Sequence, residues 1–426
     1  MNYEQALEYM YSQLPMYQRV GGTAFKKDLT NTLALCEAMG NPQKKFKSIH
    51  IGGTNGKGSS SSFTAAILQR AGYKVGLYTS PHLQSFTERI RVNGQNLPEK
   101  EVVQFVEQYQ ELIEEVKPSF FEMTVAMAFE HFAKEQVDYA VIEVGLGGRL
   151  DSTNVIEPEA CLITNIGMDH MDMLGDTPQA IAAEKAGIIK SKTPVVISQT
   201  QKEVSTVFMD KAKEVNAPIT FGDRKYTVRD GVEGTIDVYK DGMLWGTEVN
   251  VGLKGKYQYY NLPGVLKLID VLNPLLPKKI KKDDIIGGLE NVVKLTAVKG
   301  RWQQLGTSPQ IFCDVGHNEE GIKEIIKQIG SLSFQKLHMV LGVVKEKDLS
   351  KILTLLPEDA TYYFCTPKVP RGLSATELQK AADQAGLKGI VIEDVKEAVA
   401  TAKQEASVED LIFIGGSTFV VAELDL

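Results

Sequence analysis

The sequence predicts an α/β protein with two domains. The larger N-terminal domain is expected to have a doubly wound, mostly parallel sheet with a phosphate loop and a small antiparallel appendage, and the C-terminal domain to be a smaller α/β unit. At 426 residues the chain is too long for one ordinary core. Apolar, strand-like runs alternate with helical patterns over most of its length. A glycine-rich stretch with one lysine stands between the first of these strands and a helix.

The glycine-rich stretch at residues 48–60 has the order of a phosphate-binding loop: a β-prone run, a glycine cluster with Lys57, and a helical pattern. Glycines let successive backbone N–H groups converge on an anion, the helix N-terminus adds partial positive charge, and the lysine adds a full charge. The match to the common pattern is imperfect. Ile51 occupies the position of the first glycine of that pattern, and Gly58 separates the lysine from Ser59. A glycine-rich turn without a ligand is the alternative.

The first domain is predicted to alternate strands and helices before its pattern changes near residue 218. Within residues 226–251, Asp230-Gly231 and Asp241-Gly242 separate short β-prone runs and indicate hairpins, hence an antiparallel appendage. The elements expected before and after it are helical residues 1–46, the loop strand, helix 63–71, strand 73–79, helices 99–116 and 121–135, strands 137–144 and 161–166, a helix from residue 177, strand 194–198, and helices 258–273 and 283–290.

Residues 291–300 are the expected hinge, and a second alternation follows it. The elements expected there are strand 310–315, helix 319–329, strand 337–342, helix 348–356, strand 361–366, helix 375–385, strand 389–392, helix 394–405 and strand 411–414. This pattern predicts two domains, at residues 1–295 and 296–426.

Composition and charge exclude several classes of protein. The net charge of −7 argues against a broad nucleic-acid-binding surface. Cys36, Cys161, Cys313 and Cys365 show no CxxC spacing and no signal peptide is apparent, so reduced thiols in a cytoplasmic protein are expected. No apolar run approaches the ~20 residues of a membrane span. No long apolar stripe demands a protein partner, so we expect a monomer that acts on small molecules.

Unusual polar residues stand where the predicted parallel strands end, which is where ligands bind in such sheets. Glu143 ends an otherwise apolar strand, and a carboxylate there is costly unless it is paired or binds a metal. It is therefore the best candidate for Mg²⁺, with a structural salt bridge as the alternative. The hydroxyl of Ser80, which precedes Pro81, is placed to reach the same ion, although a turn-forming role explains it equally well.

Other candidate residues have ordinary explanations when each is taken alone. His170 also follows a strand, where histidine more often caps or packs than binds a ligand. Lys185 lies in an alanine-rich helical pattern and is expected to be a solvated surface lysine. Arg301, Asp314 and His317, beyond the hinge, are candidates to close over a nucleotide from the second domain.

Together these motifs resemble folylpolyglutamate synthase, sometimes bifunctional with dihydrofolate synthase, within the Mur ligase superfamily. The resemblance covers nearly the whole chain, and the departures in the phosphate loop are what this family shows. The motifs that carry it are Gly53-Thr54-Asn55-Gly56-Lys57-Gly58-Ser59, Tyr78-Thr79-Ser80-Pro81-His82-Leu83, Glu143-Val144-Gly145-Leu146-Gly147-Gly148-Arg149, Asp169-His170 followed by Glu184-Lys185-Ala186-Gly187-Ile188-Ile189, and Asp314-Val315-Gly316-His317-Asn318.

The resemblance implies an ATP site and two Mg²⁺ ions. It implies that Ser80, Glu143 and His170 bind Mg²⁺, and that Lys185 matches a carbamylated lysine whose added carboxylate ligates a second Mg²⁺. The first domain becomes an ATP-binding domain with a folate site, and the second a glutamate ligase domain. The positions implied to bind ATP are Thr54, Asn55, Gly56, Lys57, Gly58, Ser59, Asn261, Arg301 and Asp314, with His317 near them.

The resemblance also implies a pterin site. Its segments match Ser119, Phe120, Phe121 and Glu122, and Leu150, Asp151 and Ser152. The sequence departs from the bifunctional pattern at Ser152, where such enzymes often have alanine, and this leaves dihydrofolate synthase activity open. Val315-Gly316 replaces the commoner Gly-Ala and is conservative in size.

We therefore predict an ATP-dependent amide-forming ligase. The γ-carboxylate of a folate, or of its last glutamate, is expected to attack the γ-phosphate of ATP and give an acyl phosphate and ADP. The amine of L-glutamate then displaces phosphate. Lys57, His170 and Lys185 would assist this chemistry from the first domain, and Arg301 would add positive charge when the domains close.

Three other functions compete with this prediction. Dihydrofolate synthase, which joins L-glutamate to dihydropteroate, uses the same chemistry alone or as a second activity. A cell-wall Mur ligase would need a nucleotide-sugar-binding domain before the phosphate loop, and about 46 residues are too few for one. An ATP-gated binding module is a third possibility, but it would need fewer metal-site residues than the Glu143 and His170 clusters offer.

Overall fold

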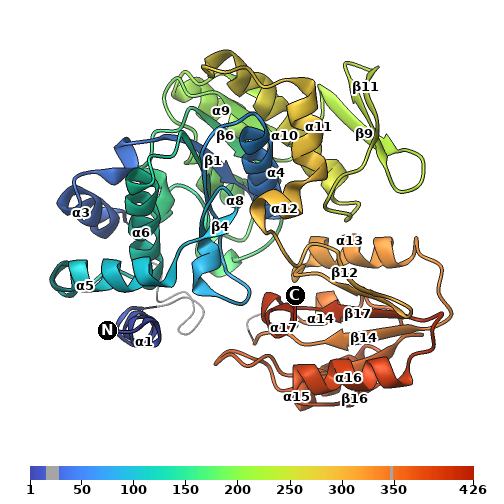
Figure 1. Cartoon of the computed structure of the whole chain (residues 1–426). Helices are drawn as coiled ribbons and strands as arrows, with labels where there is room; N and C mark the ends of the chain where they lie inside the picture. Colours follow the sequence, from blue (N-terminus) through green and yellow to red (C-terminus); the bar gives the residue numbers. More distant parts are fainter. Residues whose placement is uncertain (16–27, 346–348) are drawn as a thin grey trace. The chain divides into compact units, whose positions relative to one another are not determined.

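The computed structural model describes residues 1–15, 28–345 and 349–426, which fall into two compact units (Figure 1). The first unit comprises Met1–Gly252 and Gln258–Val298, and the second comprises Leu253–Tyr257 and Lys299–Leu426. The expected helical residues 16–27 and the start of the expected helix 348–356 lie outside the described residues. The roles assigned to the two predicted domains stay a prediction.

Among the described residues, the first unit contains an eight-stranded sheet in the order β4-β3-β2-β5-β1-β6-β7-β8. Its strands are parallel except at the edge, where β3 pairs antiparallel with β2 and with β4. The central strands are buried on both faces, which is why they appear in the sequence as continuous apolar runs. The strands are β1 (Lys47–Gly52), β2 (Val75–Tyr78), β3 (Ile90–Val92), β4 (Gln95–Asn96), β5 (Tyr139–Glu143), β6 (Ala160–Ile163), β7 (Val195–Ile197) and β8 (Ile219–Phe221).

Helices cover both faces of this sheet (Figure 1). Ile142, His50 and Cys161 lie side by side in register, so they share one face. Ile142 packs in the core formed with α1 (Tyr3–Gln13), α3 (Thr30–Ala38), α5 (Glu99–Val116) and α6 (Phe120–Lys134), and Cys161 packs with α8 (Pro178–Ala186) and α9 (Ser205–Glu214). Helix α4 (Lys57–Arg70) packs with α10 (Gln258–Leu272), α11 (Lys282–Glu290) and α12 (Val292–Thr296).

The predicted appendage is confirmed as a three-stranded antiparallel sheet of β9 (Tyr226–Asp230), β10 (Ile236–Lys240) and β11 (Met243–Val249). Asp241 and Gly242 join the last two strands with φ values of 50° and 78°, the backbone of a two-residue hairpin turn. The change of pattern expected near residue 218 falls later in the structure, because β8 still pairs parallel with β7 in the main sheet. A strand of three residues is too short for its sequence pattern to indicate which strand it pairs with.

The second unit contains, within its described residues, a six-stranded sheet in the order β12-β13-β17-β14-β15-β16. Only β12 runs antiparallel to its neighbour. Apolar cores lie on both faces. The elements are β12 (Gln303–Thr307), β13 (Gln310–Cys313), α13 (Glu319–Ile329), β14 (Leu337–Leu341), α14 (Leu349–Leu353), β15 (Thr361–Phe364), α15 (Ala375–Gln384), β16 (Gly389–Val391), α16 (Val395–Glu405), β17 (Leu411–Gly415) and α17 (Thr418–Ala422).

Several elements differ from the sequence-based expectations. Helix α4 begins at Lys57 rather than near residue 63, although glycine and serine are poor helix formers, because the residues of its first turns are buried by tertiary packing. The expected hinge at 291–300 contains helix α12. Helix α9, the β3–β4 hairpin and β12 were not predicted from the sequence, and these three strands are short or lie at sheet edges.

No helix in the part of the chain that the structure describes is both long and apolar enough to cross a bilayer.

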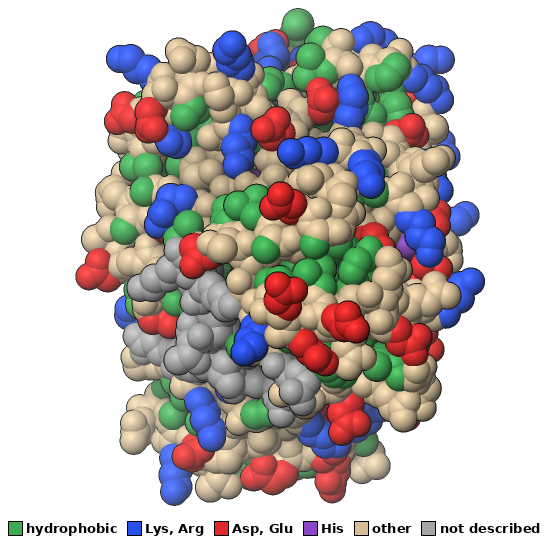
Figure 2. All heavy atoms as spheres, turned by 90° about the vertical axis from the view of Figure 1, so that its left-hand side faces the viewer, with side chains coloured by type: hydrophobic (Ala, Val, Ile, Leu, Met, Phe, Trp, Pro, Cys, Tyr) green, Lys and Arg blue, Asp and Glu red, His purple; other side chains and the backbone are tan. Residues whose placement is uncertain are grey.

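Figure 2 shows one face of the molecule, on which acidic and basic side chains are interspersed. Such a mixture differs from the basic stripe that a nucleic-acid-binding face presents.

A glycine in α11 tests the packing of this helix against α4. A Cβ added at Gly288 would lie 2.7 Å from Cα of Ile67. Alanine is the better helix former, yet this clash with backbone should make Gly288→Ala destabilising by about 1–3 kcal/mol in urea unfolding. At Gly246 the nearest atom to an added Cβ is 3.5 Å away. Gly246→Ala is therefore the matched control, and equal stability of both variants would contradict the close approach of the helices.

Candidate functional site

The candidate site lies where β2, β5, β1 and β6 end, and these strands are neighbours in the sheet. Ser80 follows β2, Glu143 is the last residue of β5, the phosphate loop follows β1, and Asp169 and His170 follow β6. Because the strands are parallel, their carboxyl ends share one edge, and the fold brings these distant segments together.

The phosphate loop has a backbone that only glycine can adopt at two positions. Gly53 has φ +136°, and a Cβ there would lie 1.8 Å from Oγ1 of Thr164. Gly56 has φ +83°, and a Cβ there would lie 2.1 Å from Oδ1 of Asn261. Both the backbone conformation and the lack of space require glycine, so the sequence fixes the shape of this loop.

Hydrogen bonds fasten the loop to the segment after β6. The Thr54 N–H donates to the carbonyl of Asn165 at 2.9 Å, and the Asn55 N–H donates to its side-chain oxygen at 2.9 Å. The Thr164 hydroxyl donates to the Asn55 carbonyl at 2.6 Å, and the Gly167 N–H donates to the Thr54 hydroxyl at 3.0 Å. Asn165 therefore holds the phosphate loop in place, and this role was not predicted from the sequence. A polar residue at the end of an apolar strand was the available signal.

The start of α4 suits a phosphate. The helix begins at Lys57, and no side chain caps its first turn. The Lys57 ammonium donates to the Thr54 carbonyl at 3.1 Å, so it stays beside the loop. Ser59 accepts a hydrogen bond from the Gln258 amide at 3.2 Å, and Gln258 in turn accepts from Asn261 at 2.8 Å. Backbone N–H groups, a helix N-terminus and an ammonium together fit the phosphates of ATP.

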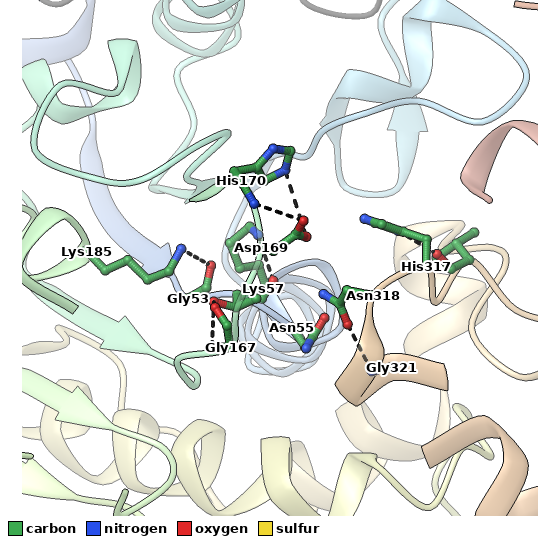
Figure 3. Close-up of polar contacts among 12 residues, drawn as sticks. Gly53, Asn55, Lys57, Gly167, Asp169, His170, Lys185, His317, Asn318 and Gly321 are labelled. Carbon is green, nitrogen blue, oxygen red and sulfur yellow. Dashed lines mark hydrogen bonds and ion pairs between the residues drawn. The ribbon is translucent and has the colours of Figure 1, made fainter. Parts of the chain in front are cut away.

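Glu143, a predicted metal ligand, and Asp169, beside the predicted ligand His170, bring carboxylates to the strand ends on either side of the loop. Glu143 is buried, and its Oε2 accepts the Ser80 N–H at 3.2 Å. Asp169 accepts the His170 N–H at 3.1 Å and lies 3.9 Å from Nε2 of the imidazole (Figure 3). These donors suit Mg²⁺. Over the described ranges no three His, Cys, Asp or Glu side chains gather into a complete metal site.

Lys185 differs most from its sequence-based expectation. The expected surface lysine is only 4% exposed, and its ammonium donates to the Gly53 carbonyl at 2.9 Å (Figure 3). Burial, reinforced by the charge of Lys57, lowers the pKa of Lys185 to about 7. A large fraction of this side chain is therefore a neutral amine near neutral pH. The sequence carried no signal for this, because only tertiary packing buries the side chain.

Asp151 lies in a buried hydrogen-bonded chain. It accepts the N–H of Leu146 at 2.8 Å and the N–H and hydroxyl of Thr153, and burial raises its pKa. The Thr153 oxygen contacts Nε2 of His50 at 2.8 Å. Burial also lowers the pKa of His50 to about 3, so this histidine is neutral. Ser152 is buried beside Asp151, and Leu150 is partly exposed.

The predicted segment 119–122 forms the start of α6. Ser119 and Glu122 cap this helix reciprocally, so their side chains already have structural partners. Phe120 is buried, with the Arg89 guanidinium 5.3 Å from its ring centroid. Phe121 is partly exposed and packs over Gly145, where an added Cβ would lie 2.3 Å from its ring. Of these four residues, Phe121 is the one with a partly exposed side chain.

The second unit presents its own polar loop after β13. Asp314 is buried there, and its carboxylate accepts hydrogen bonds from the Trp302 and Gly316 N–H groups at 2.7 Å. Burial raises the pKa of Asp314, and the nearby Arg301 charge partly opposes this. Nδ1 of His317 lies 3.0 Å from the Val315 carbonyl (Figure 3).

The sequence matches two protein-family models. The Mur ligase middle domain matches residues 51–268, and the glutamate ligase domain of Mur ligases matches residues 300–418. Among known proteins, the dihydrofolate synthase/folylpolyglutamate synthase of Bacillus subtilis is 30% identical over 420 residues, which cover 94% of each chain. The folylpolyglutamate synthase of Lacticaseibacillus casei is 32% identical over 390 residues, covering 88% of this chain and 87% of that relative.

Solved structures resemble the whole chain. FolC of Escherichia coli in complex with DHPP and ADP matches with a TM-score of 0.87 and 26% identity, covering 99% of this chain and 96% of the other. The bifunctional folylpolyglutamate synthase/dihydrofolate synthase of Yersinia pestis, complexed with AMPPNP and a manganese ion, matches with a TM-score of 0.84 and 26% identity, covering 99% and 97%.

Because the amine of Lys185 is buried, we expect its removal to raise the unfolding free energy of the protein. The pKa of Lys185 is about 7 in the folded protein, whereas the ordinary lysine value of 10.5 applies in the unfolded chain. Between these values the unfolded chain holds a proton that the folded protein has released, so the unfolding free energy rises with pH across this window. We expect Lys185→Met to stabilise the protein by about 2–4 kcal/mol at pH 6 in urea unfolding, and by less at pH 9.

Lys213→Met, at an exposed position on α9, is the control for this measurement. It should change the unfolding free energy by less than about 0.5 kcal/mol at either pH. A Lys185→Met protein no more stable than the parent at pH 6 would contradict the desolvation of this amine.

Proposed function

The chain belongs to the dihydrofolate synthase/folylpolyglutamate synthase family and carries the middle and glutamate ligase domains of the Mur ligases, and from this premise we propose its reaction in detail. It is an ATP-dependent amide-forming ligase that joins L-glutamate to a folate. We assign residues 1–295 to ATP and folate binding and residues 296–426 to the glutamate ligase domain. The observation that carries this proposal is the glycine-constrained loop at the start of α4, beside the buried Glu143 and Lys185.

The proposed reaction has two steps. A γ-carboxylate oxygen of tetrahydrofolate, or of the last glutamate of a folylpolyglutamate, attacks the γ-phosphorus of ATP. This forms an acyl phosphate while the bond to the ADP oxygen breaks. The amine of L-glutamate then attacks the acyl carbon, phosphate leaves, and the nitrogen loses a proton to give the amide. A carboxylate is a poor acylating agent, and phosphorylation supplies the leaving group that it lacks.

The contribution of the chain is positioning and charge neutralisation. Residues 54–59 hold the phosphates through backbone N–H groups, and Lys57 offsets charge on the transferring phosphoryl group. The placement of Lys57 beside the Thr54 carbonyl supports this role. We assign Asn261, Arg301 and Asp314 to nucleotide contacts, with His317 near them.

We propose that two Mg²⁺ ions serve the site. Ser80, Glu143 and His170 would hold one ion, and carbamylated Lys185 the other. Bound Mg²⁺ neutralises charge on the phosphates. A neutral amine is the form that adds to CO₂, with loss of a proton, so the pKa of about 7 at Lys185 supports carbamylation near neutral pH. The manganese ion and AMPPNP in the Yersinia pestis relative support a divalent metal beside the nucleotide.

The folate is assigned to the segments 119–122 and 150–152. The partly exposed Phe121 ring and the fixed carboxylate of Asp151 support this assignment, because a pterin has both a flat face and N–H donors. Dihydrofolate synthase activity is the second candidate. The bifunctional name of the Bacillus subtilis relative favours it, whereas Ser152 leaves it open. We further propose that the protein acts as a cytoplasmic monomer on small molecules.

A parallel assay tests the substrate. Purified protein with MgATP and L-glutamate should release ADP when tetrahydrofolate is supplied. Dihydropteroate is the second acceptor. Turnover with tetrahydrofolate alone would make the enzyme a dedicated polyglutamylating ligase and connect Ser152 to this restriction, whereas turnover with both would make it bifunctional. Absence of ADP release with either acceptor would refute the assigned substrate.

Removing the loop lysine tests the mechanism. Lys57→Ala should lower kcat by a factor of about 10² or more, because it removes a charge that stabilises the transferring phosphoryl group. Circular dichroism should show an intact fold, since Lys57 lies at the start of α4 and does not pack in a core. Lys213→Ala on α9 is the control and should keep parental activity. A fully active Lys57→Ala enzyme would exclude the proposed role.

A further inference from the structure

The segment Leu253–Tyr257 belongs to the second unit, although the residues on both sides of it belong to the first. The chain therefore passes between the units after Gly252, after Tyr257 and again after Val298. We call Leu253–Tyr257 the crossing segment. Its two ends join the appendage strand β11 and helix α10, both in the first unit.

Two side chains hold the crossing segment within the second unit. Gln328 on α13 is buried, and its amide donates to the Lys254 carbonyl at 3.2 Å and accepts the Lys256 N–H at 2.7 Å. The Tyr257 hydroxyl donates to Oδ2 of Asp314 at 2.6 Å. Burial and the Asp314 charge raise the pKa of Tyr257, so the hydroxyl keeps its proton. Hydrogen bonds of this kind, to an ionised acceptor, are the strong ones.

The Asp314 carboxylate also binds the other connection between the units. Its Oδ2 accepts the Trp302 N–H at 2.7 Å, and Trp302 lies shortly after the passage at Val298. Its Oδ1 accepts the Gly316 N–H at 2.7 Å, which shapes the loop that contains His317. One carboxylate thus ties together both connections and the polar loop of the second unit.

The next residue along the chain is fixed to the phosphate loop. The Gln258 amide donates to the Ser59 hydroxyl at 3.2 Å and accepts from Asn261 at 2.8 Å. Asn261 in turn lies against Gly56, where it leaves no space for a Cβ. A single peptide bond, between Tyr257 and Gln258, therefore separates a residue held by Asp314 from a residue held by the phosphate loop.

We propose that Tyr257 is a positioning residue that couples the phosphate loop to the Asp314 loop of the second unit. A shift of Ser59 or Asn261 when phosphate binds moves Gln258, and the backbone passes this movement to Tyr257 and through its hydroxyl to Asp314. We therefore expect loss of the Tyr257 hydroxyl to reduce turnover more than it reduces the affinity for ATP. The inference rests on the proposed function, because it takes ATP to bind at the phosphate loop.

Tyr257→Phe tests the coupling, since it removes the hydroxyl and keeps the ring. We expect kcat to fall about tenfold or more, with the dissociation constant of AMPPNP within about twofold of the parent in calorimetric titration. Tyr259→Phe is the matched control. Its hydroxyl also donates to a carboxylate, that of Asp230, at 2.6 Å, but Asp230 ends β9 in the appendage. This variant should keep the parental kcat.

Gln328→Leu is a second variant, which frees Lys254 and Lys256 from α13 while Tyr257 is kept. It should lower kcat in the same direction with AMPPNP affinity retained, and it tests the proposal if Tyr257→Phe does not fold. A variant that only lowers the melting temperature, with parental kcat at 25 °C, would show a structural role and overturn the proposal. A loss of AMPPNP affinity that matches the loss of kcat would overturn it too.

Hydrogen exchange separates this inference from the proposed function. Binding of AMPPNP should slow exchange of the Trp302 and Gly316 amides, which donate to Asp314, more in the full-length parent and in Tyr259→Phe than in Tyr257→Phe, because the nucleotide contact assigned to Asp314 itself is common to all three proteins. This readout needs no folate and no turnover. Equal protection in all three proteins would overturn the coupling, whereas failure of ligation alone would count against the substrate assignment only.

Discussion

The hydrogen bond from Lys185 to the Gly53 carbonyl is the interaction on which the candidate site most depends. It joins helix α8 to the phosphate loop and places an amine, 4% exposed, where the charge of Lys57 opposes its protonation. Folding alone does not favour such an arrangement, because a buried ammonium loses its hydration. With a pKa of about 7, this amine is partly neutral at neutral pH, and it lies beside the backbone of the phosphate loop. Buried groups with strongly shifted pKa values are concentrated at functional sites, which is why Lys185 is a candidate site residue.

The parallel sheet explains why residues so distant in the sequence share a site. Strands β2, β5, β1 and β6 are adjacent although their order along the chain is different, and each contributes the residues after its carboxyl end. The site is then tightened by contacts between these ends. Ser80 donates to Glu143, and the Thr54 and Asn55 N–H groups donate to Asn165. The shape of the loop is thus fixed by contacts within the protein, and a loop held in this way needs less ordering to bind phosphate.

The sequence predicted those features that depend on local chemistry. Continuous apolar runs indicated buried parallel strands, and Asp241-Gly242 indicated a hairpin, since both follow from neighbouring residues. The burial of Lys185 was missed because it depends on Gly53 and other residues far away in the chain. The contact of Gln258 with Ser59 was missed for the same reason. The early start of α4 was missed because helix propensity disfavours Gly58 and the following serines, and tertiary packing overrides propensity.

The candidate folate segment contains a carboxylate, that of Asp151, which is held by several contacts. Asp151 is fixed by the Leu146 N–H and by Thr153, whose oxygen contacts the buried, neutral His50 behind it. Burial lowers the pKa of His50 to about 3, so the imidazole at the end of this chain of contacts is neutral near neutral pH. Ser152 stands next to that fixed carboxylate. The contacts that hold Asp151 come from Leu146 and Thr153, so a change of the Ser152 side chain removes none of them, and the proposed link of Ser152 to the choice of acceptor does not depend on these contacts.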